Sequence, residues 1–220
     1  MFSASGASVR RVKVSPSPIY SMVAIGNAIV VSTQRMVGGK LLLLHRWNAE
    51  SDSLVGSFFE PPEVRNASRR IVTTTGGAFV TARADTLVVT FSLADSLYLF
   101  PGAAKDPIKR ALSLRSFTYH VGEAPNSGPL TSAFRLWLQK GARVERAFYA
   151  ADGALYVQYL RFGSYGPDWF LARFSASGTR TLDAETGAQL LFVASSGPVF
   201  ADPATGSPSV WQLASPKVHR

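Results

Sequence analysis

The sequence predicts an all-β protein made of consecutive four-stranded antiparallel units. Three observations predict this fold class. Short apolar runs recur along the whole chain, tight-turn residues join them in pairs, and each apolar pair is followed by a more polar pair. The 220 residues are 46% hydrophobic and only 17% charged, which is enough apolar material for a sizeable core.

Four segments have the pattern of a β-hairpin, with a tight turn between two short apolar runs. They are Tyr20–Thr33, Gly77–Ser92, Arg146–Tyr159 and Leu190–Pro203. The expected turns are Gly26-Asn27, Ala84-Asp85, Asp152-Gly153 and Ser196-Gly197. Asn, Asp and Gly tolerate the positive φ that two-residue hairpins require, so each segment is predicted to be a hairpin.

A second and more polar hairpin follows each of the first three segments, and half of one follows the last. These are Lys40–Phe59, Ser96–Leu114, Trp169–Ala184 and Ser209–Ala214. The first two strands of each unit are apolar nearly throughout, whereas the outer two alternate. Such a gradient is typical of the blades of a β-propeller, whose inner strands are covered on both faces. A sandwich or another all-β fold remains the alternative, although its strands would alternate more uniformly.

The whole chain, residues 1–220, is therefore expected to be one β-propeller domain with about four blades visible. The end of one blade is expected at 1–14, whole blades at 19–60, 77–114 and 143–185, and a partial blade at 188–214. Phe2–Gly6 repeats the turn sequence Phe174–Gly178, and Val9–Val14 would follow it as an outer strand. This strand would either close a ring of four blades or belong to a larger ring truncated at its N-terminus. Six to eight blades are more usual, which favours truncation.

The repeat resembles that of the bacterial six-bladed β-propellers of the NHL/TolB-like kind. The segment Ala150–Gly178 carries the resemblance most clearly, with an apolar run, an Asp-Gly turn, a second apolar run, an aromatic residue and a polar turn with glycine. The resemblance extends over essentially the whole chain. It implies binding of a ligand, peptide or partner more often than catalysis.

The long connections are expected on one face of the propeller, which makes that face the predicted binding site. They are Pro61–Gly76, Arg115–Gly141 and Arg161–Asp168, because connections between blades and between the second and third strands share a face. Long loops on a rigid scaffold often carry recognition residues. The candidate ligand-binding residues are Arg69, Arg70, His120, Trp137, Arg161, Tyr165, Asp168 and Trp169.

Within Arg115–Gly141, Pro129 and Thr131 or Ser132 are expected to start a short helix that ends at Gly141. Its apolar face would hold Phe134, Trp137 and Leu138, either as an aromatic cap over the channel mouth or, as we favour, to fill a gap between blades. In the segment 161–169, the Arg, Tyr, Asp and Trp side chains could hold a ligand. Trp169 could equally pack between blades.

Catalytic and metal-binding signatures are missing from the sequence. There is no cysteine, the three histidines (His45, His120 and His219) are dispersed, and no metalloprotease, nucleophile-elbow or phosphate-loop motif occurs. No cofactor is indicated. The favoured function is a binding module for a small molecule, glycan or peptide. The alternative is a propeller hydrolase or lyase in which His120, Glu123, Arg161 and Asp168 meet at the channel mouth.

The net charge of +9 comes from 23 basic and 14 acidic residues, and most of them are scattered. The clusters at Arg10–Lys13 and Arg65–Arg70 lack the interleaved aromatic residues of a single-strand platform, so nucleic acid is not the favoured partner. No apolar run approaches the roughly 20 residues of a membrane span. As written, the chain has no secretory signal and is expected in the cytoplasm, or in the periplasm or outside the cell if its N-terminus is truncated.

Overall fold

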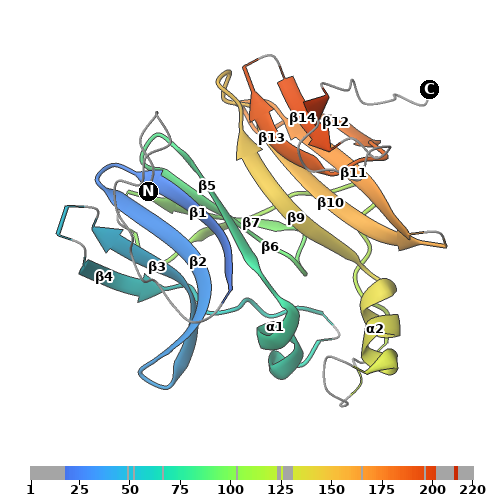
Figure 1. The fold of residues 1–220 in the computed structure, drawn as a ribbon, viewed down its shortest axis with the longest axis horizontal. Coiled ribbons are helices and arrows are strands. Elements are labelled where there is room, and N and C mark those ends of the chain that lie inside the picture. The colour runs from blue at the N-terminus through green and yellow to red at the C-terminus, as the bar shows by residue number, and fades with distance from the viewer. Residues whose placement is uncertain are drawn as a thin grey trace.

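The computed structural model describes residues 18–48, 50–51, 53–65, 67–102, 104–122, 125, 131–164, 166–195, 197–201 and 211–212. Within these residues the protein is mostly β, with four antiparallel sheets and two helices (Figure 1). The prediction of an all-β chain is confirmed at this level. The expected strand Val9–Val14, its repeat at Phe2–Gly6 and the site candidate Tyr165 lie outside the described residues.

The four sheets follow one another along the chain, and the described strands of each sheet pair in sequence order. The first sheet contains β1 (Ile19–Ile25), β2 (Ala28–Val37), β3 (Lys40–Asn48) and β4 (Ser53–Phe58). The second contains β5 (Ala78–Arg83), β6 (Thr86–Phe91), β7 (Ser96–Pro101) and β8 (Ile108–Ala111). The third contains β9 (Ala142–Tyr149), β10 (Leu155–Gly163), β11 (Gly166–Phe174) and β12 (Arg180–Glu185). The fourth contains β13 (Leu190–Ala194), β14 (Gly197–Ala201) and β15 (Trp211–Gln212).

Two-residue turns close the first hairpins of the first two sheets, as predicted. Gly26-Asn27 joins β1 to β2, and Ala84-Asp85 joins β5 to β6, with φ of +57° at Gly26 and +51° at Ala84. Asp152-Gly153 instead lies within a longer loop between β9 and β10. In the fourth sheet Ala194 pairs with Gly197, so Gly197, predicted as a turn residue, begins β14 instead.

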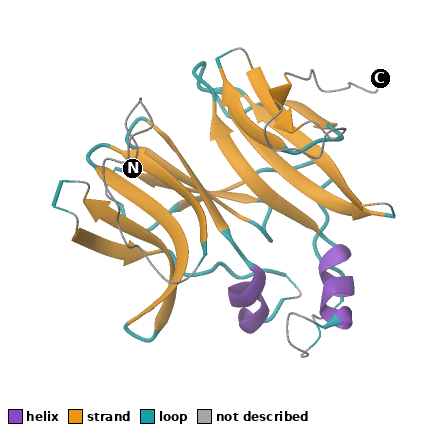
Figure 2. Ribbon diagram, in the orientation of Figure 1, coloured by secondary structure: helices purple, strands orange, loops and turns teal. Residues whose placement is uncertain are grey.

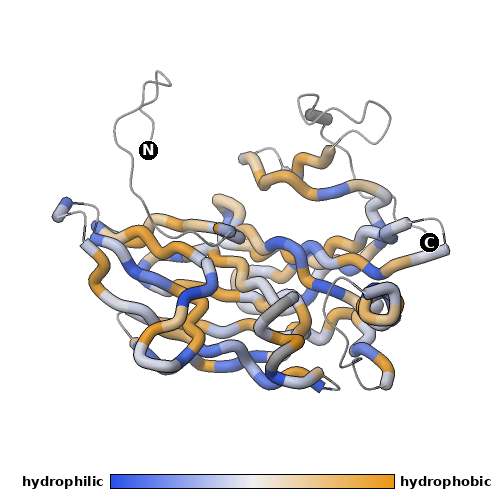
Figure 3. The backbone as a smooth tube through the Cα atoms, turned by 60° about the horizontal axis from the view of Figure 1, so that its bottom comes forward, coloured by the Kyte–Doolittle hydropathy of each residue, from blue (hydrophilic) through white to orange (hydrophobic). Residues whose placement is uncertain are grey.

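The apolar side chains are buried between consecutive sheets. Val30 of the first sheet and Val89 of the second belong to one cluster, and Leu112 belongs with Val157 to another. A third cluster joins Tyr156 to Phe200 of the fourth sheet. Because neighbouring residues of a strand point to opposite faces, Tyr156 and Val157 show that the third sheet is covered on both sides. The sheets therefore pack face to face in chain order, and polar and apolar residues alternate along many strands (Figure 3).

Buried polar groups hydrogen-bond each sheet to the next. Ser32 of β2 donates its hydroxyl to the carbonyl of Ala78 at 2.6 Å, at the start of the second sheet. Gln158 of β10 donates to the carbonyl of Ala188 and accepts from the amide of Leu190, at 3.0 and 2.8 Å. These two side chains have no exposed surface, so their polar atoms must be satisfied inside the protein. Ser32 thus holds the start of the second sheet against the first, and Gln158 holds the start of the fourth sheet against the third.

The first strands of the sheets lie next to one another. β5 lies against β1 and β9, and β9 also lies against β13 (Figure 1). At the outer side of the second sheet, all four residues of β8 are exposed. Neighbouring sheets are therefore held together at their first strands, and the space between them opens toward the outside.

The two helices lie at the same end of the sheets (Figure 2). α1 (Arg69–Thr75) precedes β5, and α2 (Ser132–Gln139) precedes β9. Thr131 caps α2 by accepting a hydrogen bond from the amide of Phe134, and the helix begins at Ser132, one of the starting residues expected from the sequence. Ile71 of α1 shares a buried cluster with Phe134 and Trp137 of α2, so two connections far apart in the sequence pack together.

No helix among the described residues is long and apolar enough to cross a lipid bilayer.

Candidate functional site

A groove of about 710 Å³ lies between the second and third sheets. One wall comes from β7, β8 and the β5–β6 turn, and the other from β9, β10 and the β11–β12 turn. The groove forms because β5 and β9 hold the sheets together at their first strands, while the short β8 leaves the outer space unfilled. Its volume falls within the range of pockets that bind small molecules.

The floor of the groove is apolar. Leu97 and Leu99 line it from β7, and Leu155 and Phe174 line it from the third sheet. Leu155 and Phe174 also belong to the buried cluster between these sheets, which fixes their positions. The floor therefore presents a rigid apolar surface to whatever enters.

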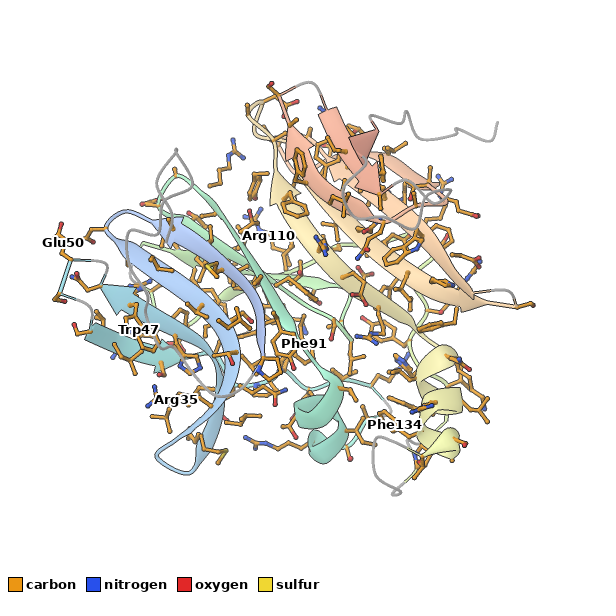
Figure 4. The ribbon with its side chains drawn as sticks, viewed as in Figure 1. Arg35, Trp47, Glu50, Phe91, Arg110 and Phe134 are labelled. Atoms are coloured by element: carbon orange, nitrogen blue, oxygen red, sulfur yellow. The ribbon has the colours of Figure 1, made fainter. Side chains whose placement is uncertain are left out.

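Three arginines and a tyrosine surround this floor. Arg83, at the end of β5, donates a hydrogen bond to the carbonyl of Ala176 at 3.1 Å, and its guanidinium carbon lies 5.8 Å from the ring centre of Tyr149. Arg110 lies in β8, and its side chain lies in the space between the two sheets (Figure 4). Asp85 is the only carboxylate among the described lining residues. The rim is therefore positively charged.

Tyr149 lines the groove together with Arg83 and Arg110. Burial raises the pKa of its phenol, and the positive charges of Arg83 and Arg110 partly oppose that rise. The positive charges of Arg83 and Arg110 therefore both act on the phenol oxygen of Tyr149.

The third arginine is already used by the protein. Arg180 donates to the carbonyl of Ser113, and its Nη1 lies 3.4 Å from a carboxylate oxygen of Asp183. That carboxylate also accepts hydrogen bonds from the Tyr159 hydroxyl and the Arg115 amide, each at 2.6 Å. This network ties the segment after β8 to the third sheet and closes one end of the groove.

The groove lies at the opposite end of the sheets from the helices. α1 and α2 precede the starts of β5 and β9, whereas Arg83 and Tyr149 are at the ends of the same two strands. The long connections that the sequence analysis selected therefore occupy a different face. The structure thus contains two separate candidate surfaces.

On the helical face, His120 and Trp137 are buried and stacked on each other. Their ring centres are 4.3 Å apart, the Nε2 of His120 donates to the carbonyl of Leu138 at 3.1 Å, and the indole of Trp137 donates to the carbonyl of Gly122. Burial lowers the pKa of His120. Both side chains hold α2 against the sheets, which agrees with the favoured interpretation that the helix fills a gap.

Arg69 lies beside a second, smaller pocket of about 530 Å³, lined also by Pro61, Pro62 and Val72. Its guanidinium pairs with Glu60 at 2.9 Å, and Lys40 pairs with the same carboxylate at 2.7 Å. Arg70 is the second residue of α1. Arg69 therefore shares the single carboxylate of Glu60 with Lys40.

The segment 161–168 forms the end of a tight hairpin between β10 and β11, so the prediction of a long loop there is wrong. β10 extends to Gly163, β11 begins at Gly166, and Arg161 pairs with Asp168 across the strands. The two side chains form an ion pair at 3.8 Å, and Trp169 lies in β11. Gly163 and Gly166 pair with each other at the ends of the two strands and flank the short turn.

The predicted residues therefore do not meet in one place. His120 and Trp137 are together, Arg161, Asp168 and Trp169 share the β10–β11 hairpin, and neither pocket described above is lined by any of these five. The acid–base set of the alternative enzyme hypothesis stays a prediction, since Glu123 lies outside the described residues. Among the residues that the structure describes, no cluster of histidine and acidic side chains could hold a metal ion.

The groove itself was not predicted from the sequence. Its basic residues, Arg83 and Arg110, sit in separate strands within ordinary turn and edge sequences. One signal was present, because Arg110 lies in a short, exposed outer strand.

No known protein family matches the chain, and no curated protein is significantly similar to it in sequence.

Proposed function

We propose that this chain is a binding module of the β-propeller type that takes a small molecule into the groove between its second and third sheets. One observation carries the proposal: an open groove with an apolar floor and a polar, basic rim lies between two sheets held firmly elsewhere. Pockets of this composition and size are typical ligand sites. The likeness to NHL/TolB-like propellers is proposed with it.

The stacking of the sheets supports the propeller interpretation. Each described sheet packs on the next in chain order, first strands are adjacent, and the outer β8 is exposed. In a propeller the inner strands gather around a central axis in this way. Such a scaffold places its variable parts, the turns and connections, around a rigid core.

The helical face is a second candidate, for a protein or peptide partner. Tyr119, Val121 and Leu136 expose 39, 69 and 60% of their surface on α2 and the segment before it. The buried Phe134 and Trp137 fix the helix beneath them. Exposed apolar side chains on a rigid support are typical of interaction surfaces.

A substitution that fills the groove tests the proposal. Ala111 is exposed at the end of β8 and lines the groove, so Ala111→Trp should block the groove without disturbing the buried core. In a screen of small molecules by ligand-observed NMR, we expect compounds that bind the wild type to lose binding at least about tenfold in this variant.

Ala133→Trp is the matched control, because Ala133 is exposed on α2 and lies outside the groove lining. This variant should bind the same compounds as the wild type. Binding that survives Ala111→Trp and is lost in Leu136→Asp would instead favour the helical face. Binding unchanged by any of the three would contradict a site in the groove.

A further inference from the structure

We propose that the groove selects a small organic anion, a carboxylate or phosphate ester with an apolar body, which Arg83, Arg110 and Tyr149 hold over the apolar floor. This inference rests on the proposed function and specifies the ligand class of the same site. It follows from the distribution of charge, from the state of each arginine and from the shape of the floor.

Charge distribution is the first argument. Three arginines and one carboxylate, that of Asp85, line the groove among the described residues. Asp85 sits in the β5–β6 turn at the edge, where it accepts a hydrogen bond from the Thr86 hydroxyl at 3.4 Å. The lining therefore carries more positive than negative charge, and an anion is the ligand that such a field attracts.

The state of each arginine is the second argument. Arg180 is paired with Asp183, and its charge is largely compensated. Within the described part of the chain, neither Arg83 nor Arg110 forms an ion pair with a carboxylate. Arg83 is nevertheless oriented by its bond to the Ala176 carbonyl and by the ring of Tyr149. An oriented but uncompensated guanidinium is suited to a carboxylate or phosphate.

Tyr149 connects the two arginines into one site. The field of both guanidinium groups acts on its phenol. Its hydroxyl can donate a hydrogen bond to an oxyanion that lies between them. Gly153 lies close to the Arg83 guanidinium, because a Cβ at this position would be only 3.1 Å from one of its nitrogens. The loop between β9 and β10 thus leaves room for the Arg83 side chain.

The floor decides what else the ligand must contain. Leu97, Leu99, Leu155 and Phe174 offer hydrophobic surface and no hydrogen-bonding group from their side chains. Inorganic phosphate would interact with the arginines of the rim but leave the apolar floor in contact with water. A ligand that also carries a ring or short chain would cover the floor. The site therefore favours an anion with an apolar body over a bare inorganic anion.

Four probes, which differ in whether they carry a negative charge and an apolar body, test the inference by isothermal titration calorimetry of the full chain. The probes are 1-naphthoate, 1-naphthyl phosphate, neutral 1-naphthylmethanol and inorganic phosphate. We expect a naphthyl anion to bind at least about tenfold more tightly than the neutral alcohol and than inorganic phosphate. The two naphthyl anions separate a carboxylate site from a phosphate site.

Arginine variants identify the residues that hold the anion. Arg110→Gln and Arg83→Gln should each weaken binding of the preferred naphthyl anion by about tenfold and leave the alcohol unchanged. Arg135→Gln removes the same charge from the exposed surface of α2 and should change neither. Circular dichroism of each variant confirms that it is folded.

Three other outcomes would contradict the proposed ligand class or its assignment to the groove. If the neutral alcohol binds as tightly as the anions, and Ala111→Trp abolishes both, the groove binds ligands but the anion class is wrong. If the anions bind and Arg135→Gln weakens them as much as Arg110→Gln, the attraction is one of overall charge and not of this site. If no naphthyl probe binds at millimolar concentration, the anion proposal fails.

Discussion

Individual buried polar residues are satisfied by short, specific contacts. His45 has no exposed surface, its Nε2 lies 3.1 Å from the carbonyl of Thr33, and its Nδ1 lies 2.8 Å from the Ser57 hydroxyl. A carbonyl can only accept, so Nε2 carries the proton and Nδ1 accepts from Ser57. Burial lowers the pKa of His45, and the ring is held neutral. His45 therefore connects β2, through Thr33, with β4, through Ser57.

The half-buried carboxylate of Asp95 lies in an environment that disfavours its charge. Its carboxylate accepts from the amide of Leu114 at 3.2 Å, yet burial raises its pKa and the negative charge of Asp183 raises it further. Arg180 opposes both effects. An acid whose pKa is raised in the folded state favours folding most when it is protonated, and this advantage is lost as pH rises through the folded pKa.

We therefore expect Asp95→Asn to stabilise the protein at pH 7. The amide oxygen can still accept from Leu114, while the repulsion from Asp183 disappears. The gain should be about 0.5–1 kcal/mol, because the half-buried carboxylate is partly solvated. It should shrink as pH falls toward the unfolded-state pKa near 3.9. Urea unfolding at several pH values measures both effects.

Asp106→Asn serves as the control, since Asp106 is exposed between β7 and β8. Its effect on the unfolding free energy should be smaller and should depend little on pH. A loss of stability in Asp95→Asn at pH 7 would contradict the expectation.

At the scale of single elements, α2 shows how a glycine positions a helix. Gly141 follows α2 and precedes β9, and a Cβ there would lie 2.5 Å from the ring of His120. The stacked pair of His120 and Trp137 can approach the chain this closely only because the side chain is missing. The contact is steric, and no unusual backbone angle is involved.

Gly141→Ala should therefore destabilise the protein by about 1–3 kcal/mol, the usual cost of overfilling a packed region. It should also weaken the stacking on Trp137, which a change in tryptophan fluorescence would report. Gly56→Ala is the matched variant in β4, where an added Cβ meets nothing within 4 Å. An equal loss in both variants would show that the space beside His120 is not the cause.

Elements were predictable where local chemistry decides them. The β-hairpins and α2 follow from turn residues, apolar spacing and the Thr131 cap. α1 was missed because its sequence is rich in β-branched residues and its Ser68 side chain makes no capping bond. The β10–β11 hairpin was missed because glycines serve a flexible loop and a tight turn equally well.

The site was less predictable than the elements because it depends on sheet packing. The groove combines side chains from β5, β7, β8, β9, β10 and the β11–β12 turn, and no local pattern marks such a set. Long connections are visible in a sequence, whereas the space between two sheets is not. Sequence patterns therefore indicate the helical face and not the groove.

At the scale of the whole molecule, stability depends on how one sheet is joined to the next. Gln158 links the third sheet to the fourth through two hydrogen bonds, and Ser32 links the first to the second through one. The carbonyl of Ala188 has a second donor in the Thr186 hydroxyl, whereas the buried Leu190 amide depends on Gln158.

Gln158→Leu should cost about 2–3 kcal/mol, because it leaves the Leu190 amide without its partner inside the protein. Ser32→Ala removes a single donor and should cost about 1 kcal/mol. Urea unfolding followed by circular dichroism gives both values, and limited proteolysis locates the opened region. Faster cleavage in the fourth sheet for Gln158→Leu alone is the expected pattern, and uniform loosening in both variants would contradict it.

The links between sheets also have a direction, with consequences for how such a chain can change in evolution. At two of the three boundaries, a side chain of the second strand reaches forward to the start of the following sheet, from Ser32 and from Gln158. Such an interface is head-to-tail, so the same contact can be repeated in one direction until the stack ends or closes into a ring. A duplication that copied a whole sheet with such a contact would carry the contact to a new boundary. The length of the protein could thus grow or shrink by entire sheets.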